Sequence, residues 1–249
     1  MTSALEPING KLERAHETVV TLQSEISALF RERKHPVICN DDIKLIFDEA
    51  QYQFGKKVPV RFSVLAGEVI HHFRSCFDHI AWQLADPAVK CEHPTRIEFP
   101  VCLDVADKDK AARYQRAIKL FPSASARRLI DNVQPYQALK VGQEPRKWRL
   151  WILHRLDSMC KHRTLPLAFT GFDFGSPALN ALALRYGSDP SFEPPIEVIR
   201  QAQEEMNVTP IIVLDEFHEG KAEPLIPGLE QLGAFTREWV SMFEEELLK

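Results

Sequence analysis

Residues 61–86, RFSVLAGEVIHHFRSCFDHIAWQLAD, carry the clearest helical pattern of the chain. On a helical wheel of about 100° per residue, their apolar side chains share one broad face. That face contains Phe62, Leu65, Ala66, Val69, Ile70, Phe73, Phe77, Ile80 and Leu84. A face of this width buries against other helices, so the stretch predicts one helix of a bundle. Asp86-Pro87 ends it, because proline disfavours helical geometry in the residue before it.

The same spacing of apolar residues predicts helices on both sides of this stretch. The first covers residues 8–33 and ends before Pro36. Residues 108–132 predict two short helices, the second with Ser123 as its N-cap. Residues 145–162 and 225–248 complete the predicted bundle of four to five helices.

Two regions change to the alternating pattern of strands. Residues 37–60 alternate apolar and polar side chains between turn-like segments, and residues 164–217 do so with breaks at proline. The segment 87–107 has no regular period. The sequence therefore predicts an α+β protein, in which a helical bundle is joined by a small antiparallel β-layer. We expect residues 1–249 to form a single domain.

The composition is that of a globular protein. The chain has 249 residues, of which 45% are hydrophobic and 27% charged, and this excludes a disordered or collagen-like chain. No signal-peptide pattern and no uncharged apolar run of transmembrane length occurs. The five cysteines form no C-x-x-C pair. We therefore expect a cytoplasmic protein with reduced thiols and no membrane partner.

Several enzyme classes lack their sequence motifs. The chain has no glycine-rich phosphate loop, no dinucleotide-binding fingerprint, no G-x-S-x-G elbow and no H-E-x-x-H pair. The sequence thus predicts no cofactor and gives no support to a kinase, a Rossmann enzyme, a serine hydrolase or a zinc protease.

The central helix carries many side chains that can do chemistry. Glu68, His72 and His79 lie within about 40° of one another on the wheel, while Arg74 and Asp78 lie on the opposite flank of the apolar face, together with His71. Histidine exchanges protons near neutral pH, and arginine binds phosphate. Cys76 falls near the apolar face, where we expect it to pack as a small hydrophobic residue.

Arg74 and His79 form an Arg-x4-His pattern on this helix. The pattern resembles the motif of the HEPN superfamily of helical-bundle ribonucleases, with Ser75 where that family often has Asn, Asp or His. The resemblance implies a homodimer that cleaves RNA without a metal. It implies that His79 is the general acid or base and Arg74 the phosphate clamp, with Asp78 and His72 orienting them.

A second polar cluster follows in the predicted helix 145–162. His154, Asp157 and Lys161 share its polar face, whereas Arg155 and His162 lean towards the apolar side. A buried arginine needs a carboxylate partner, and Asp78 or Glu68 can supply one for Arg155. We expect four residues to bind substrate, and these are His72, Lys161, His162 and Arg163.

Three patterns together resemble a group of bacterial proteins. They are Phe73-Arg74-x-x-Phe77-Asp78-His79, Gln134-Pro135-Tyr136 and Asp157-x-x-Cys160-Lys161-His162-Arg163. The resemblance covers about residues 60–165 and implies a shared fold, but it implies no activity.

Charge is divided unevenly along the chain. Residues 108–163 contain 14 Lys and Arg against 4 Asp and Glu, and residues 189–249 contain 4 against 14. A basic segment can attract a phosphate backbone, with bases stacking on interleaved aromatics such as Tyr114 and Phe121. The alternative is that the two segments neutralise each other within the fold.

Three other interpretations stay open. Arg74 and His79 can belong to a buried ion-pair network that ties the two polar helices together through Asp78, Arg155, Asp157 and His162. The chain can also be a non-enzymatic module that binds a ligand or a protein. A third possibility is a metal-dependent enzyme with Glu68, His72 and His79 as ligands.

Overall fold

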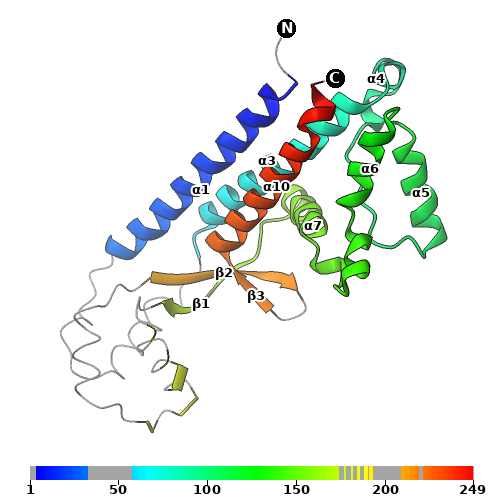
Figure 1. The fold of residues 1–249 in the computed structure, drawn as a ribbon. Coiled ribbons are helices and arrows are strands. Elements are labelled where there is room, and N and C mark those ends of the chain that lie inside the picture. Colours follow the sequence, from blue (N-terminus) through cyan, green and yellow to red (C-terminus); the bar gives the residue numbers. More distant parts are fainter. Residues whose placement is uncertain are drawn as a thin grey trace. The chain divides into compact units, whose positions relative to one another are not determined.

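A computed structural model describes residues 4–32, 58–173, 209–218 and 221–248, with a few single positions between 177 and 192. The chain divides into two compact units. The first comprises Met1–Val20, Ser63–Leu165 and Ile226–Lys249, and the second Thr21–Phe62 and Pro166–Leu225. The predicted α+β class is confirmed, because helices dominate and a small antiparallel sheet accompanies them (Figure 1). The expectation of a single domain stays a prediction.

Four helices supply most of the buried side chains of the first unit. They are α1 (Glu6–Glu32), α3 (Val60–Leu84), α7 (Arg149–His162) and α10 (Leu225–Leu247). The apolar face predicted for residues 61–86 is buried except at the half-buried Leu84, and Phe77 and Ile80 are fully inaccessible to solvent. Phe99 joins α3 to α10, because its ring meets Phe77 at 5.0 Å and Phe243 at 6.1 Å between centroids. Cys76 is buried as expected.

Short helices connect α3 to α7. The segment expected to be irregular begins with α4 (Pro87–Glu92), because the Asp86 side chain accepts a hydrogen bond from the Ala88 N–H and caps it. Helices α5 (Lys108–Ile118) and α6 (Ala124–Asn132) follow, and Ser123 caps α6 as predicted. The remaining turns are 3-10 helices at Pro94–Arg96, Pro135–Val141 and Pro145–Lys147. The last of these explains why α7 begins at Arg149 rather than at residue 145.

The second unit holds a three-stranded antiparallel sheet in the order β1-β2-β3. Strand β1 (Leu167–Asp173) pairs with β2 (Thr209–His218), and β2 pairs with β3 (Lys221–Pro224). Leu167 lies opposite Leu214, and both pairings contain a register shift. The strands predicted at 37–60 lie almost wholly outside the described residues. None of the helices that the structure describes is long and apolar enough to cross a membrane.

Candidate functional site

Two polar clusters lie on α3, and α7 contributes to one of them. We call Arg74, Asp78 and the backbone of Phe99 the closed cluster, because Arg74 is only 4% exposed. We call His71, Asp157 and Lys161 the open cluster, because the His71 and Lys161 side chains are each 53% exposed. His71 and Arg74 are three residues apart on α3, so both clusters draw on the same flank of this helix.

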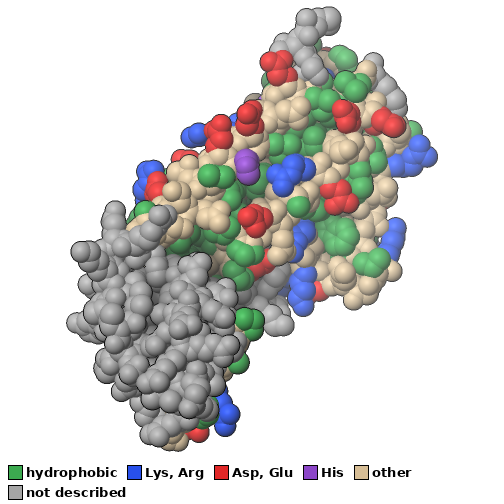
Figure 2. Space-filling model, turned by 60° about the vertical axis from the view of Figure 1, so that its left-hand side comes forward, with side chains coloured by type: hydrophobic (Ala, Val, Ile, Leu, Met, Phe, Trp, Pro, Cys, Tyr) green, Lys and Arg blue, Asp and Glu red, His purple; other side chains and the backbone are tan. Residues whose placement is uncertain are grey.

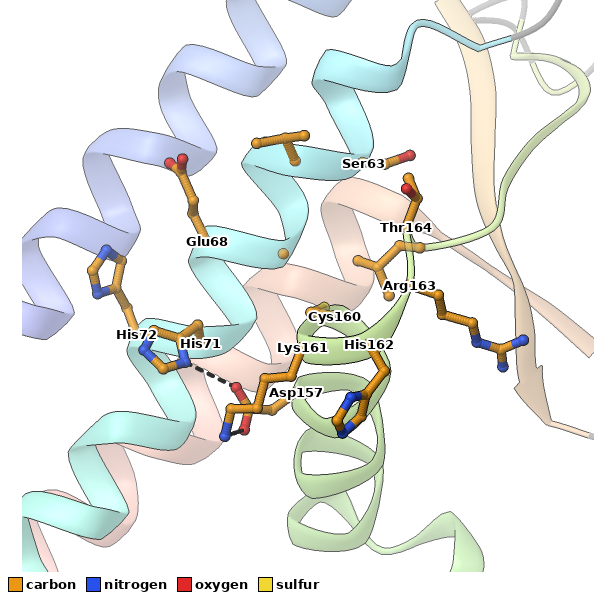
Figure 3. Close-up of a pocket in the computed structure, with 13 residues that line it drawn as sticks. Ser63, Glu68, His71, His72, Asp157, Cys160, Lys161, His162, Arg163 and Thr164 are labelled. Atoms are coloured by element: carbon orange, nitrogen blue, oxygen red, sulfur yellow. Dashed lines mark hydrogen bonds and ion pairs between the residues drawn. The ribbon is translucent and has the colours of Figure 1, made fainter.

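A pocket of about 580 Å³ opens beside the open cluster. Helix α3 and the C-terminal end of α7 with the chain that follows it form its wall, and apolar atoms make up most of the lining. All of its lining residues belong to the first unit. Figure 3 shows His71 and Lys161 pointing towards Asp157, whereas Arg163 points away from it. The lining therefore combines apolar surface with charged side chains: Glu68 on α3, the pair of Asp157 and Lys161 on α7, and Arg163 after α7.

Asp157 organises the open cluster. Its side chain is 4% exposed, with Oδ1 lying 3.0 Å from His71 Nδ1 and Oδ2 lying 2.6 Å from Lys161 Nζ. The spacing of four residues places Lys161 one helical turn after Asp157. Burying a carboxylate without partners costs free energy. The folded state therefore favours the positions of His71 and Lys161 in which both contact Asp157. When His71 carries its proton on Nδ1, it donates to Asp157 and leaves Nε2 as a free acceptor.

His72 also lines the pocket but points away from Asp157 (Figure 3). Its Nδ1 is buried, and it has no hydrogen-bond partner in the described part of the chain. Burial lowers the pKa of His72, and the positive charges of Lys11 and Arg14 on α1 lower it further. His72 therefore stays neutral to lower pH than a free histidine.

The pocket holds no activated nucleophile. Burial raises the pKa of the Cys160 thiol to about 11, so the sulfur is protonated at neutral pH. Ser63 and Thr164 also line the pocket, but neither bonds to a histidine among the described residues. A reaction at this site would therefore use water or a nucleophile that belongs to the substrate.

The closed cluster satisfies the buried Arg74. Its Nη1 donates to Asp78 Oδ1 at 2.7 Å, and its Nη2 donates to the Phe99 carbonyl at 3.0 Å. Asp78 in turn accepts from the Phe99 backbone N–H at 3.0 Å. Arg74 and Asp78 therefore hold the segment containing Phe99 against α3. The ion-pair interpretation predicted that Arg74 would tie α3 to α7. Its bonds instead stay within α3 and the segment of Phe99.

His79 and His154 lie outside both sets of hydrogen bonds. His79 is half-buried and makes no hydrogen bond to another described residue. His154 on α7 is half-buried, and burial lowers its pKa, as does the nearby charge of Arg74. Among the predicted network partners, Arg155 and His162 are exposed. The apolar leaning expected of these two residues is therefore wrong, because they occupy the outer side of α7.

The sequence predictions divide between the two clusters. The expected substrate-binding residues His72, Lys161, His162 and Arg163 all line the pocket. The expected catalytic residues Arg74, Asp78 and His79 do not, and Arg74 is sealed in the closed cluster. The sequence did not single out His71 and Asp157 as binding or catalytic residues, and the structure brings them together at the pocket. The four-residue spacing of Asp157 and Lys161 was the one signal available for that cluster.

Glu68, His72 and His79, the three residues considered as metal ligands, extend too far along α3 to bind one ion. A helix rises about 1.5 Å per residue, so the backbone positions of Glu68 and His79 are about 16 Å apart along the helix axis. No group of three His, Cys, Asp or Glu that could hold a metal occurs within the described ranges.

No family model, curated protein or solved structure matches the chain.

Proposed function

We propose that the pocket cleaves RNA without a metal, with His71 as the general base. The observation that supports this proposal is the His71–Asp157 pair, in which a buried carboxylate holds one ring nitrogen and leaves the other available to a substrate. A carboxylate in this position fixes the tautomer and orientation of the histidine and stabilises it once protonated.

RNA suits a site with a base and no nucleophile, because its 2′-hydroxyl can attack the adjacent phosphorus. His71 Nε2 takes the proton of that hydroxyl as the 2′-oxygen bonds to phosphorus. The bond from phosphorus to the 5′-oxygen breaks, and a protonated histidine supplies the proton that the leaving oxygen needs. The products are a 2′,3′-cyclic phosphate and a free 5′-hydroxyl.

His162 is positioned to be the general acid. It lines the pocket, it is exposed, and it makes no bond to another described residue. Lys161 lies on the same side, and the N–H donors of its ammonium group that Asp157 does not accept can bond the phosphate oxygens. This assignment keeps the ribonuclease class that the Arg-x4-His resemblance implies, but it moves the proton transfers from His79 to His71 and His162.

The homodimer and the roles of Arg74 and His79 stay predictions.

A binding module without turnover is the second candidate. The 2.6 Å pair between Lys161 and Asp157 favours it, because an ion pair of this kind already neutralises the lysine. This alternative predicts that a ligand occupies the pocket and leaves unchanged.

The test is cleavage of a fluorescent single-stranded RNA in excess EDTA by the wild-type chain and by His71→Gln. We expect cleavage with a cyclic phosphate end, no cleavage of the 2′-deoxy analogue, and a rate at least about 100-fold lower for His71→Gln. The exposed His93→Gln is the matched control and should retain the wild-type rate. Equal rates for His71→Gln and His93→Gln would overturn the proposal.

A further inference from the structure

The outer side of α5 carries an excess of positive charge. Residues 108–128 contain seven Lys and Arg and one acidic residue, Asp109. Four of the cations are exposed and lie at least about 100° around the helix from the buried Tyr114. We call these four the basic face of α5, and they are Lys108, Arg113, Arg116 and Lys119.

Tyr114 fixes the orientation of this face. It is 4% exposed, and its hydroxyl donates to Asp131 Oδ1 on α6 at 3.1 Å. Its ring meets that of Tyr136 nearly edge-on, with centroids 5.9 Å apart. Helix α5 is therefore anchored by its inner side, and the basic face is held outward as a fixed surface.

Nearby carboxylates leave the basic face with a net positive charge. Asp109 lies on the same side of α5, four residues before Arg113, but it forms no ion pair with a described residue. Asp107 pairs with Lys110 at 3.0 Å and caps the start of α5. Asp131 accepts hydrogen bonds from Tyr114, Tyr136 and Gln137. Within the described ranges, none of the four cations of the basic face has an ion-pair partner. This differs from the side of the molecule in Figure 2, where acidic and basic side chains lie interspersed.

The pattern works against the stability of the helix. Arg113 and Arg116 are three residues apart, as are Arg116 and Lys119, and like charges at this spacing repel each other. A polyanion lying along the face would relieve this repulsion and release its own counterions.

We propose that the basic face of α5 binds the phosphate backbone of an RNA strand. The choice of RNA as the polyanion rests on the proposed function. The charge pattern of α5 is independent of that function. Tyr114 and Phe121 are 4% and 0% exposed, so the base stacking expected on them is excluded. Recognition therefore runs through phosphates and does not depend on base sequence.

The experiment is fluorescence anisotropy with a labelled 20-nucleotide RNA over a series of NaCl concentrations, in the His71→Gln background to prevent cleavage. The test variant combines Arg113→Gln, Arg116→Gln and Lys119→Gln. For three lost phosphate contacts, the slope of log affinity against log salt should fall by about 2. The affinity at low salt should fall at least about tenfold, and the thermal midpoint should stay equal or rise.

A matched control combines Arg14→Gln, Lys110→Gln and Lys147→Gln. It removes the same net charge from cations that already have carboxylate partners. We expect its salt slope to stay at the wild-type value. Equal losses in the test and control variants would overturn the proposal, because only net charge would then matter.

Two further results bear on the binding mode. Arg113→Lys with Arg116→Lys keeps the charges and should keep the affinity, so a loss there would contradict binding by charge. Oligo(A) and oligo(U) should bind within about threefold of each other, and a strong preference would contradict backbone recognition. RNA binding without cleavage would refute the proposed function alone, whereas cleavage with unchanged binding by the triple variant would refute this inference alone.

Discussion

The closed and open clusters differ in how many of their hydrogen-bonding groups are already used. In the closed cluster, Arg74 is 4% exposed and donates both to Asp78 and to the Phe99 carbonyl. In the open cluster, only Asp157 is buried, and it binds His71 and Lys161, which are each 53% exposed. The two clusters therefore use similar residue types on one helix flank for different purposes.

Residue type and spacing alone do not decide which cluster can do chemistry. The Arg-x4-His pattern falls on the closed cluster, where the arginine is already saturated. Access to a substrate and an unused donor or acceptor are found instead around Asp157. We therefore expect substitutions in the closed cluster to change stability and substitutions in the open cluster to change reactivity.

The largest effect on stability is expected for Arg74→Met. The substitution keeps most of the apolar stem but leaves Asp78 without its cation and the Phe99 carbonyl without its donor. We expect the free energy of unfolding to fall by about 3 kcal/mol, measured by urea denaturation. Arg14→Met, which breaks the exposed Arg14–Glu17 pair, is the control and should cost less than about 1 kcal/mol. A fully stable Arg74→Met would show that the arginine is not structural.

Two helical glycines, Gly233 on α10 and Gly67 on α3, give the next comparison. A Cβ at Gly233 would lie 2.8 Å from the ring of Phe73, the residue before Arg74, whereas a Cβ at Gly67 would lie 3.4 Å from Cys160 Sγ in the pocket. We expect Gly233→Ala to destabilise by about 1–2 kcal/mol through overpacking. Gly67→Ala should be neutral or stabilise by up to about 0.5 kcal/mol, because alanine favours the helix. Thermal denaturation measures both changes in stability. Equal effects would contradict tighter packing around Phe73 than around Cys160.

The smallest effect is a pH dependence carried by His154. Burial and the charge of Arg74 lower its pKa in the folded state, so the unfolded chain binds more protons as the pH falls. The stability from this group is present above the unfolded pKa of about 6.5 and is lost as the pH falls towards the folded value. We expect the free energy of unfolding to decrease from pH 7.5 to pH 5, and His154→Gln to reduce that decrease. An unchanged pH slope in His154→Gln would contradict this prediction.

Much of the helical fold could be predicted from the sequence. The apolar period of residues 61–86 indicated α3, and Ser123 marked the start of α6, because both signals act within a few residues of the chain. Helix α4 was missed, since its cap at Asp86 was interpreted only as the end of the preceding helix. Strand β3 was missed because four residues are too few to show a period.

The candidate site could be predicted only in part. The spacing of Asp157 and Lys161 is local and indicated a shared face, which the 2.6 Å pair confirms. The partnership of His71 with Asp157 joins residues 86 positions apart, and it depends on the register in which α3 packs against α7. The sequence also placed Arg155 towards the interior, whereas Arg74 is the arginine that the core accepts. Single-helix wheels do not contain this packing information.

RNA cleavage by Asp157→Asn and Asp78→Asn, measured side by side and expressed per folded molecule, separates the roles of the two clusters. We expect Asp157→Asn to fold and to lose at least about 100-fold in rate, because His71 loses its charged partner. Asp78→Asn should lose stability but keep the wild-type rate within about threefold. A fully active Asp157→Asn beside a folded but inactive Asp78→Asn would contradict the account and assign the chemistry to Arg74 and His79.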